Sequence, residues 1–146
     1  MSEPTVGPAV KLRGLATVSF WADDVPSAVD WYRGILGTEP YFVRPEPPAP
    51  PAYVEFRIGD SEDEFGIIDR HFAPAAAADH PDGAVIYWHV DDLQATYDRL
   101  IEAGATTYEL PTPREAGFIT AAVVDPFGNV LGIMYNPHWL EFSAKK

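Results

Sequence analysis

The chain has 146 residues and no cysteine, and its 10 Lys and Arg against 22 Asp and Glu give a net charge of −12. This length predicts one domain, residues 1–146, and the lack of thiols excludes cysteine nucleophiles, thiolate zinc sites and iron–sulfur clusters. The negative charge opposes phosphate backbones and anionic lipids, so we expect no nucleic-acid partner and no membrane partner. Because the first residues also lack the basic and apolar regions of a signal peptide, we expect a cytoplasmic protein.

The first predicted elements are a strand over residues 15–22 and the helix that follows it. Asp24 is a typical N-cap, apolar side chains then recur at helical spacing, and Gly37 is a natural helix end. In the strand, alternation directs Val18 and Phe20 toward the helix. The opposite face of the strand then carries Thr17, Ser19 and Trp21.

A proline-rich loop and a hairpin complete the first half. Residues 45–52 hold too many prolines for a helix or a central strand. Alternating residues predict strands over 53–58 and 65–68, joined by a Gly-Asp-Ser turn. An alanine-rich linker is expected over 73–83.

The second half repeats this order. A strand over 85–90 leads to Asp92, a second N-cap, and to a helix that Gly104 ends. Strands over 118–124 and 130–135 flank the turn 125–129. An internal duplication follows, with one module over 12–72 and a second over 83–136, each with one short strand that is hard to place. Neither module buries its sheet alone, so the two should pair.

Three stretches carry a resemblance to a known superfamily. They are the segment from Trp21 to Gly37 with Asp24-Val25 and Trp31-Tyr32, the segment Val90-Asp91-Asp92-Leu93 with Ala103-Gly104-Ala105, and the turn Asp125-Pro126-Phe127-Gly128-Asn129. In this order and spacing they resemble the vicinal oxygen chelate superfamily, which comprises glyoxalase I, bleomycin-resistance proteins and extradiol dioxygenases. The resemblance implies an α+β fold in which two βαβββ modules form an open, cupped mixed sheet with helices outside. It also implies a ligand cavity inside and a homodimer.

The resemblance also locates a metal site, which this sequence lacks. Enzymes of the superfamily hold a divalent metal with His, Glu or Gln, and the matching positions here are Thr17, Gly66, Val85 and Gly132. Glycine and valine have no donor atom, and a lone threonine hydroxyl is a poor ligand. We therefore expect no metal and no cofactor.

The candidate pocket follows from the strand faces that point away from the helices. Aromatic rings can stack on a flat or cationic guest, while hydroxyls and an imidazole orient it. The glycines at 66 and 132 are expected to leave room for a bulky guest. The predicted ligand-binding residues are Thr17, Ser19, Trp21, Tyr87, His89 and Met134.

The leading hypothesis is a metal-independent protein that binds a small molecule and sequesters a flat or cationic natural product. No catalytic residue is predicted for it. The alternative is a glyoxalase-like isomerase, lyase or cyclase with His89 as general base, or with a displaced metal on His89 and Glu55 or Glu64. A third hypothesis is a regulatory partner whose pocket is packed shut.

Overall fold

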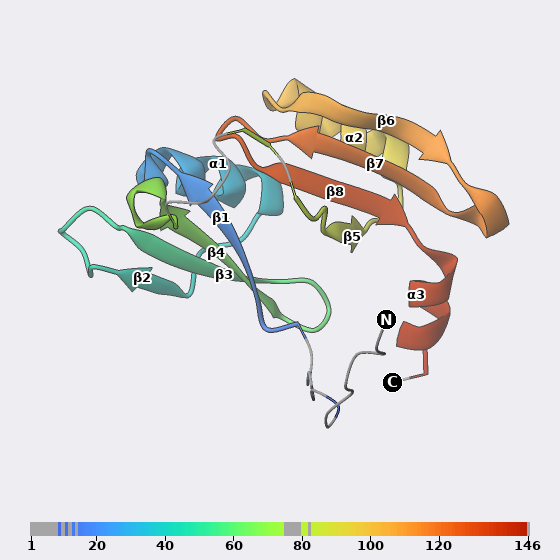
Figure 1. Ribbon diagram of the computed structural model, residues 1–146, viewed down its shortest axis with the longest axis horizontal. Helices are drawn as coiled ribbons and strands as arrows, with labels where there is room; N and C mark the ends of the chain where they lie inside the picture. The colour runs from blue at the N-terminus through green and yellow to red at the C-terminus, as the bar shows by residue number, and fades with distance from the viewer. Residues whose placement is uncertain are drawn as a thin grey trace, which may run out of the picture.

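A computed structural model describes residues 9, 11, 13, 15–74, 80, 81 and 83–145. The chain forms two four-stranded mixed sheets, one in each half of the sequence (Figure 1). In Figure 1, α2 lies behind β6 and β7, so that the view is onto the helix-free face of the second sheet.

The first sheet has the strand order β1-β4-β3-β2, with β1 parallel to β4 and the other pairs antiparallel. Its strands are β1 (Thr17–Ala22), β2 (Phe42–Arg44), β3 (Tyr53–Ile58) and β4 (Asp63–Asp69). Helix α1 (Val25–Leu36) is capped by Asp24 and ends at Gly37, whose φ of 65° suits a residue without a Cβ. A short 3-10 helix, η1 (Arg70–Phe72), follows β4.

The second sheet repeats this arrangement as β5-β8-β7-β6, with β5 parallel to β8. Its strands are β5 (Tyr87–His89), β6 (Thr106–Pro113), β7 (Ile119–Val124) and β8 (Val130–Tyr135). Helix α2 (Leu93–Glu102) is capped by Asp92, and the 3-10 helix η2 (Glu115–Gly117) precedes β7. The expected α+β fold of two βαβββ modules is confirmed. The strands form two separate four-stranded sheets rather than one continuous sheet.

Each sheet packs one face on its own helix, as the alternation predicts. Val18 and Phe20 of β1 are buried together with α1 residues such as Tyr32, whereas Thr17 and Ser19 are exposed on the other face. In the second module, the core likewise joins alternate residues of two strands to the helix, namely Ala121 and Val123 of β7, Leu131 and Ile133 of β8, and Leu93, Tyr97 and Leu100 of α2. The helix-free faces, called the inner faces below, hold polar side chains together with aromatic ones such as Tyr53 and Tyr87.

The structure places the strand that the sequence pattern left unplaced in each module, and it adds a helix near the C-terminus. Strands β2 and β6 are the outer edges of their sheets, and β6 carries prolines and two shifts of register that break its alternation. Helix α3 (Pro137–Ser143) follows β8 and begins at Asn136, which caps it. Strand β5 is shorter than the predicted 85–90 segment. Of the expected linker, residues 75–79 and 82 lie outside the described part of the chain.

The two modules are joined through the turn between β7 and β8. Asp125, which is 3% exposed, accepts a hydrogen bond from the Tyr32 hydroxyl of α1 and from the backbone N–H groups of Phe127 and Asn129. The indole N–H of Trp31 donates to the carbonyl oxygen of Ala103 at 2.8 Å. The β7–β8 turn and the end of α2 thus both dock onto α1 through polar contacts.

The longest helix of the described chain, α1, has 12 residues. None of the described helices has the length and apolar character needed to cross a bilayer.

Candidate ligand site between the modules

The six predicted pocket residues lie around two hollows between the modules. The first hollow, of about 340 Å³, is lined by Thr17, Ser19 and Trp21 of β1. The second, of about 270 Å³, is lined by Tyr87 and His89 of β5 and Met134 of β8. Ile86 lines both hollows. The structure therefore divides the predicted set into two groups of three that adjoin at one residue.

The first hollow runs along the free edge of β1 and is partly closed by Asn129. The Asn129 side-chain oxygen accepts from the Trp21 backbone N–H at 3.0 Å, and its amide nitrogen donates to the Trp21 carbonyl at 2.8 Å. One side-chain amide thus replaces a neighbouring strand at Trp21. We call this contact between β1 and the β7–β8 turn the first junction. Arg70, another lining residue, reaches the same turn through the Phe127 carbonyl at 2.8 Å.

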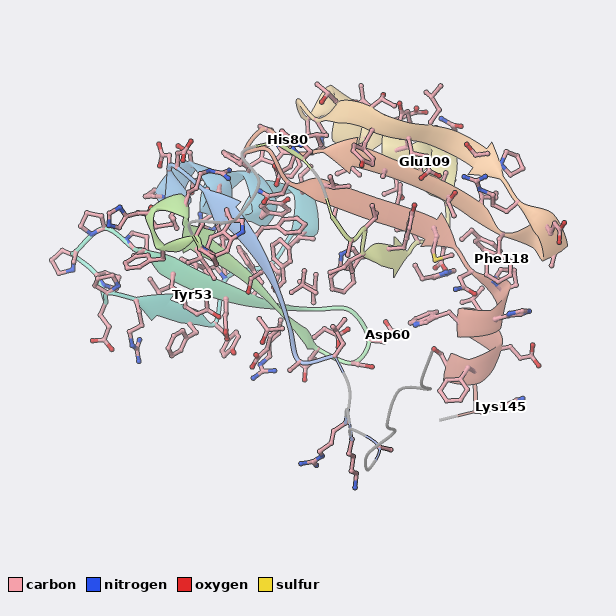
Figure 2. The ribbon with its side chains drawn as sticks, viewed as in Figure 1. Tyr53, Asp60, His80, Glu109, Phe118 and Lys145 are labelled. Carbon is pink, nitrogen blue, oxygen red and sulfur yellow. The ribbon has the colours of Figure 1, made fainter. Side chains whose placement is uncertain are left out.

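The second hollow lies between β5, the β3–β4 turn and α3. Figure 2 shows Asp60 on that turn, on the side toward α3. Asp60, Asp63 and Trp139 line this hollow together with the β5 residues. We call this contact between β5 and the β3–β4 turn the second junction.

His89 is held on both ring nitrogens and is not free to act on a substrate. Its Nδ1 accepts from the Asn136 backbone N–H at 3.0 Å, so that Nε2 carries the proton and donates to Asp91 at 3.0 Å. The ring also stacks on Trp139, with centroids 4.8 Å apart, and the side chain is only 6% exposed. In this conformation no lone pair is left for a general base, and His89 instead fixes the start of α3.

The expectation that the two glycines leave room for a guest is wrong. The Tyr53 ring lies over Gly66, where a Cβ would come within 3.3 Å of it. At Gly132 a Cβ would lie 2.9 Å from Tyr87 Cδ1 and 2.7 Å from the Ile86 carbonyl oxygen. Tyrosine rings and backbone, rather than open space, occupy these positions.

A network of tyrosines and glutamates covers the inner face of the first sheet. Tyr41 and Tyr53 both donate to Glu55, and Tyr41 also reaches Glu64 at 3.1 Å. Thr17 donates to Glu64 at 2.8 Å, and this hydrogen bond is the main reason why the pKa of Glu64 is lowered. The hydrogen bond to Glu55 raises the pKa of the Tyr41 hydroxyl to about 12. Sequence reasoning missed this network because Tyr41 lies in an irregular segment before β2.

A second network, around Glu109, covers the inner face of the second sheet (Figure 2). Glu109 accepts hydrogen bonds from Thr120 at 2.6 Å, Tyr87 at 2.8 Å and Arg114 at 3.1 Å. The Thr120 bond is the largest cause of the lowered pKa of Glu109. Burial, followed by the hydrogen bond to Glu109, raises the pKa of Tyr87. Tyr87 is therefore anchored at its hydroxyl, with its ring at the edge of the second hollow.

Neither the metal-binding positions of the superfamily that the sequence resembles nor the displaced site on His89 fits a divalent metal. A side chain at position 132 would collide with the Ile86 carbonyl oxygen, so that this position cannot carry a ligand in the observed backbone. For the displaced site, His89 is held on both nitrogens, and Glu55 and Glu64 are bound by Tyr41. Across the described residues, no three His, Asp or Glu side chains gather closely enough to hold an ion.

The sequence matches the family described as the Glyoxalase/Bleomycin resistance protein/Dioxygenase superfamily over residues 14–133. The chain belongs to this superfamily, as its motifs and its paired βαβββ modules indicate. No curated protein matches the sequence.

Solved structures share the fold at low identity. Protein ATC0852 from Agrobacterium tumefaciens is 20% identical, with a TM-score of 0.67 over 85% of this chain and 98% of its own. A glyoxalase-related enzyme from Fulvimarina pelagi is 18% identical, with a TM-score of 0.66 over 86% of this chain and 90% of its own. A superfamily member from Sphaerobacter thermophilus is 19% identical, with a TM-score of 0.66 over 86% and 98%. At these identities the likeness concerns the fold alone.

Proposed function

We propose that the protein binds a small, flat molecule in the hollows between its modules, without a metal and without altering the ligand. The observation that carries this proposal is the lining of the two adjoining hollows. They combine the Trp21 and Tyr87 rings with the hydroxyls of Thr17 and Ser19. Volumes of about 340 and 270 Å³ lie near the lower end of small-molecule pockets, which begin at roughly 300 Å³.

We assign each lining residue a role in ligand binding from its contacts. Trp21 is half-buried, with its backbone fixed by Asn129, so that its ring is a positioned stacking surface. Thr17 and Ser19 are exposed on the same side of β1 and supply hydroxyls. We assign His89 an indirect part, since its nitrogens are engaged and its ring supports Trp139 at the edge of the second hollow.

The binding function can be tested by thermal unfolding against a panel of planar aromatic natural products, with neutral phenazine as a reference probe. We expect at least one compound to raise the melting temperature. In the variant Trp21→Ala the affinity for that compound should fall about tenfold. Stacking of a planar ring system, such as a nucleobase, on an aromatic side chain contributes about 1–3 kcal/mol, and about 1.4 kcal/mol corresponds to tenfold in affinity. The matched control is Tyr108→Ala, an exposed aromatic residue outside both hollows. Equal binding by Trp21→Ala and the wild type, or no stabilisation by any compound, would contradict the proposal.

We further propose that the protein forms a homodimer, as the resemblance implies. Its described surface carries large apolar side chains on β6 and α3, among them Leu110 and Phe142, each 65% exposed. Light scattering after gel filtration should give twice the 16.1 kDa of the chain. Leu110→Glu and Phe142→Glu should each weaken a dimer that uses these surfaces, and a monomeric wild type would refute it.

A further inference from the structure

The two junctions are related by the internal duplication, so that each residue of one has a counterpart in the other. In the sheets, Ser19 pairs with Gly66 and Tyr87 pairs with Gly132. Two residues beyond Ser19 and Tyr87 lie Trp21 and His89, and three residues before the glycines lie Asp63 and Asn129. The turns agree as well, because Glu62 and Gly128 both have positive φ, 52° and 92°. Asp63 thus occupies the position that corresponds to Asn129, and it lines the second hollow together with residues of β5.

At the first junction, the Asn129 amide satisfies a free strand edge. Since Trp21 bonds outward to Asn129, alternation along β1 directs its odd-numbered backbone groups away from β4. The amide supplies one acceptor for the Trp21 N–H and one donor for the Trp21 carbonyl. This pair of hydrogen bonds closes the edge at Trp21.

At the second junction, the corresponding hydrogen bonds are missing. Gly132 donates to the Ile86 carbonyl, and the Val90 N–H donates to the Met134 carbonyl, so Ile86 and Val90 face β8. By alternation the N–H and carbonyl of His89 face the other way, toward the second hollow. Within the described ranges, no hydrogen bond joins the β3–β4 turn to β5. The Asp63 carboxylate could accept from the His89 N–H, but unlike the Asn129 amide it cannot donate, so this turn offers no side-chain donor to the His89 carbonyl.

The open junction thus presents the outward N–H of His89 together with a larger number of acceptors. The Asp63 carboxylate and the outward carbonyl of His89 lie along the same hollow, and Asp60 adds a second carboxylate. Neither lysine nor arginine is among the described residues that line it. Leu15, Met134 and Trp139 supply an apolar wall. A planar cation with several N–H donors in its plane complements this arrangement, since charge-assisted hydrogen bonds are the stronger ones.

We propose that the second hollow binds an amidinium-type group, which donates to Asp63 and to the backbone edge of β5 at His89. The ligand supplies at the second junction the hydrogen-bond donor that the Asn129 amide supplies at the first. This proposal rests on the proposed small-molecule-binding function and names the chemical group that one of the two hollows takes.

Benzamidine is the test probe, and neutral benzamide of nearly the same shape is its control. Calorimetry should show benzamidine binding to the wild type at least about tenfold more tightly than benzamide, because only the amidinium brings a charge to Asp63. In amide NMR spectra, benzamidine should shift the signals of residues 60–63 and 87–89, while the Trp21 signal stays in place.

The decisive variant is Asp63→Asn, which restores the amide found at position 129. We expect it to lose at least about tenfold in benzamidine affinity, and its own melting temperature to rise by about 2–4 °C as the amide closes the junction. Asp60→Asn is the matched control, since it removes the same charge from the same turn at a position whose counterpart, Pro126, donates nothing to β1. The benzamidine affinity of Asp60→Asn should fall by no more than about threefold.

Three results would overturn the inference: no benzamidine binding by the wild type at millimolar concentration, equal binding by Asp63→Asn, or equal losses in Asp63→Asn and Asp60→Asn. The last would indicate general attraction by the net charge of −12. These failures are distinguishable from failure of the proposed function, because phenazine and the panel test the hollows without an amidinium, through Trp21.

Discussion

The two junctions between the modules have the same backbone and different side chains. In the first, Asn129 bonds twice to β1 and the buried Asp125 receives the Tyr32 hydroxyl. In the second, Asp63 and Gly59 stand at the corresponding positions, and a hollow of about 270 Å³ lies between the turn and β5. The difference leaves one copy of the contact closed by hydrogen bonds and the other open, and the open copy is the one where we propose that a ligand binds.

The largest effect is expected from Asp125→Ala. The variant leaves the Tyr32 hydroxyl and two backbone N–H groups without their acceptor in a buried site. We expect a loss of about 3–5 kcal/mol in the free energy of unfolding, measured by urea denaturation. Asp60→Ala, on the exposed turn of the second junction, should change stability by no more than about 0.5 kcal/mol. Similar losses in both variants would show that the junctions are equivalent.

The two inner-face glycines should differ in the cost of an added methyl group. In Gly132→Ala the new Cβ meets the Ile86 carbonyl oxygen at 2.7 Å, and the backbone must move, at a cost of about 2–3 kcal/mol. In Gly66→Ala the contact is with the Tyr53 ring at 3.3 Å, which can shift, so about 1 kcal/mol is expected. Denaturation midpoints compare the two variants, and the reverse order would be inconsistent with the positions of Tyr87 and Ile86.

Removing the amide of the first junction should cost about 2 kcal/mol. Asn129→Ala abolishes both hydrogen bonds to Trp21 and leaves that strand edge open. Asp63→Ala removes the corresponding side chain of the second junction, where no such bonds exist, and should cost about 0.5 kcal/mol or less. Thermal unfolding of the two variants side by side tests the asymmetry, which equal shifts would refute.

The smallest effect concerns acid stability on the inner face of the second sheet. Hydrogen bonds from Thr120 and Tyr87 lower the pKa of Glu109 from its usual 4.5. Because the folded pKa is below the unfolded one, this stabilisation is present above pH 4.5 and is lost as the pH falls through the folded pKa. The melting temperature should therefore fall less between pH 6 and pH 3 in Glu109→Gln than in the wild type. An unchanged pH profile in the variant would show that Glu109 does not contribute.

Much of the fold could be predicted from the sequence, because its signals are local. The caps Asp24 and Asp92 and the alternation of β1 act within a few residues, and each appears in the structure. The edge strands could not be placed, since β2 has only three residues and prolines and register shifts obscure the period of β6.

The site was harder to predict because it depends on contacts between distant residues. The strand faces follow from alternation, but the engagement of His89 by Asn136 and Trp139 joins residues 47 positions or more apart. The same holds for Tyr53, whose ring over Gly66 fills space that the sequence suggested was open. One usable signal was present in the sequence: Asn129 and Asp63 align across the duplication, and of these two side chains only the Asn129 amide can both donate and accept.

Backbone hydrogen exchange at Trp21 and His89, measured by NMR in one sample of the unliganded protein, tests the asymmetry of the junctions most directly. We predict slow exchange of the Trp21 amide, which is bonded to Asn129, and fast exchange of the His89 amide, which faces the second hollow. In Asn129→Ala, Trp21 should exchange as fast as His89. Equally slow exchange of the two amides in the wild type would mean that both junctions are closed, and would contradict the account.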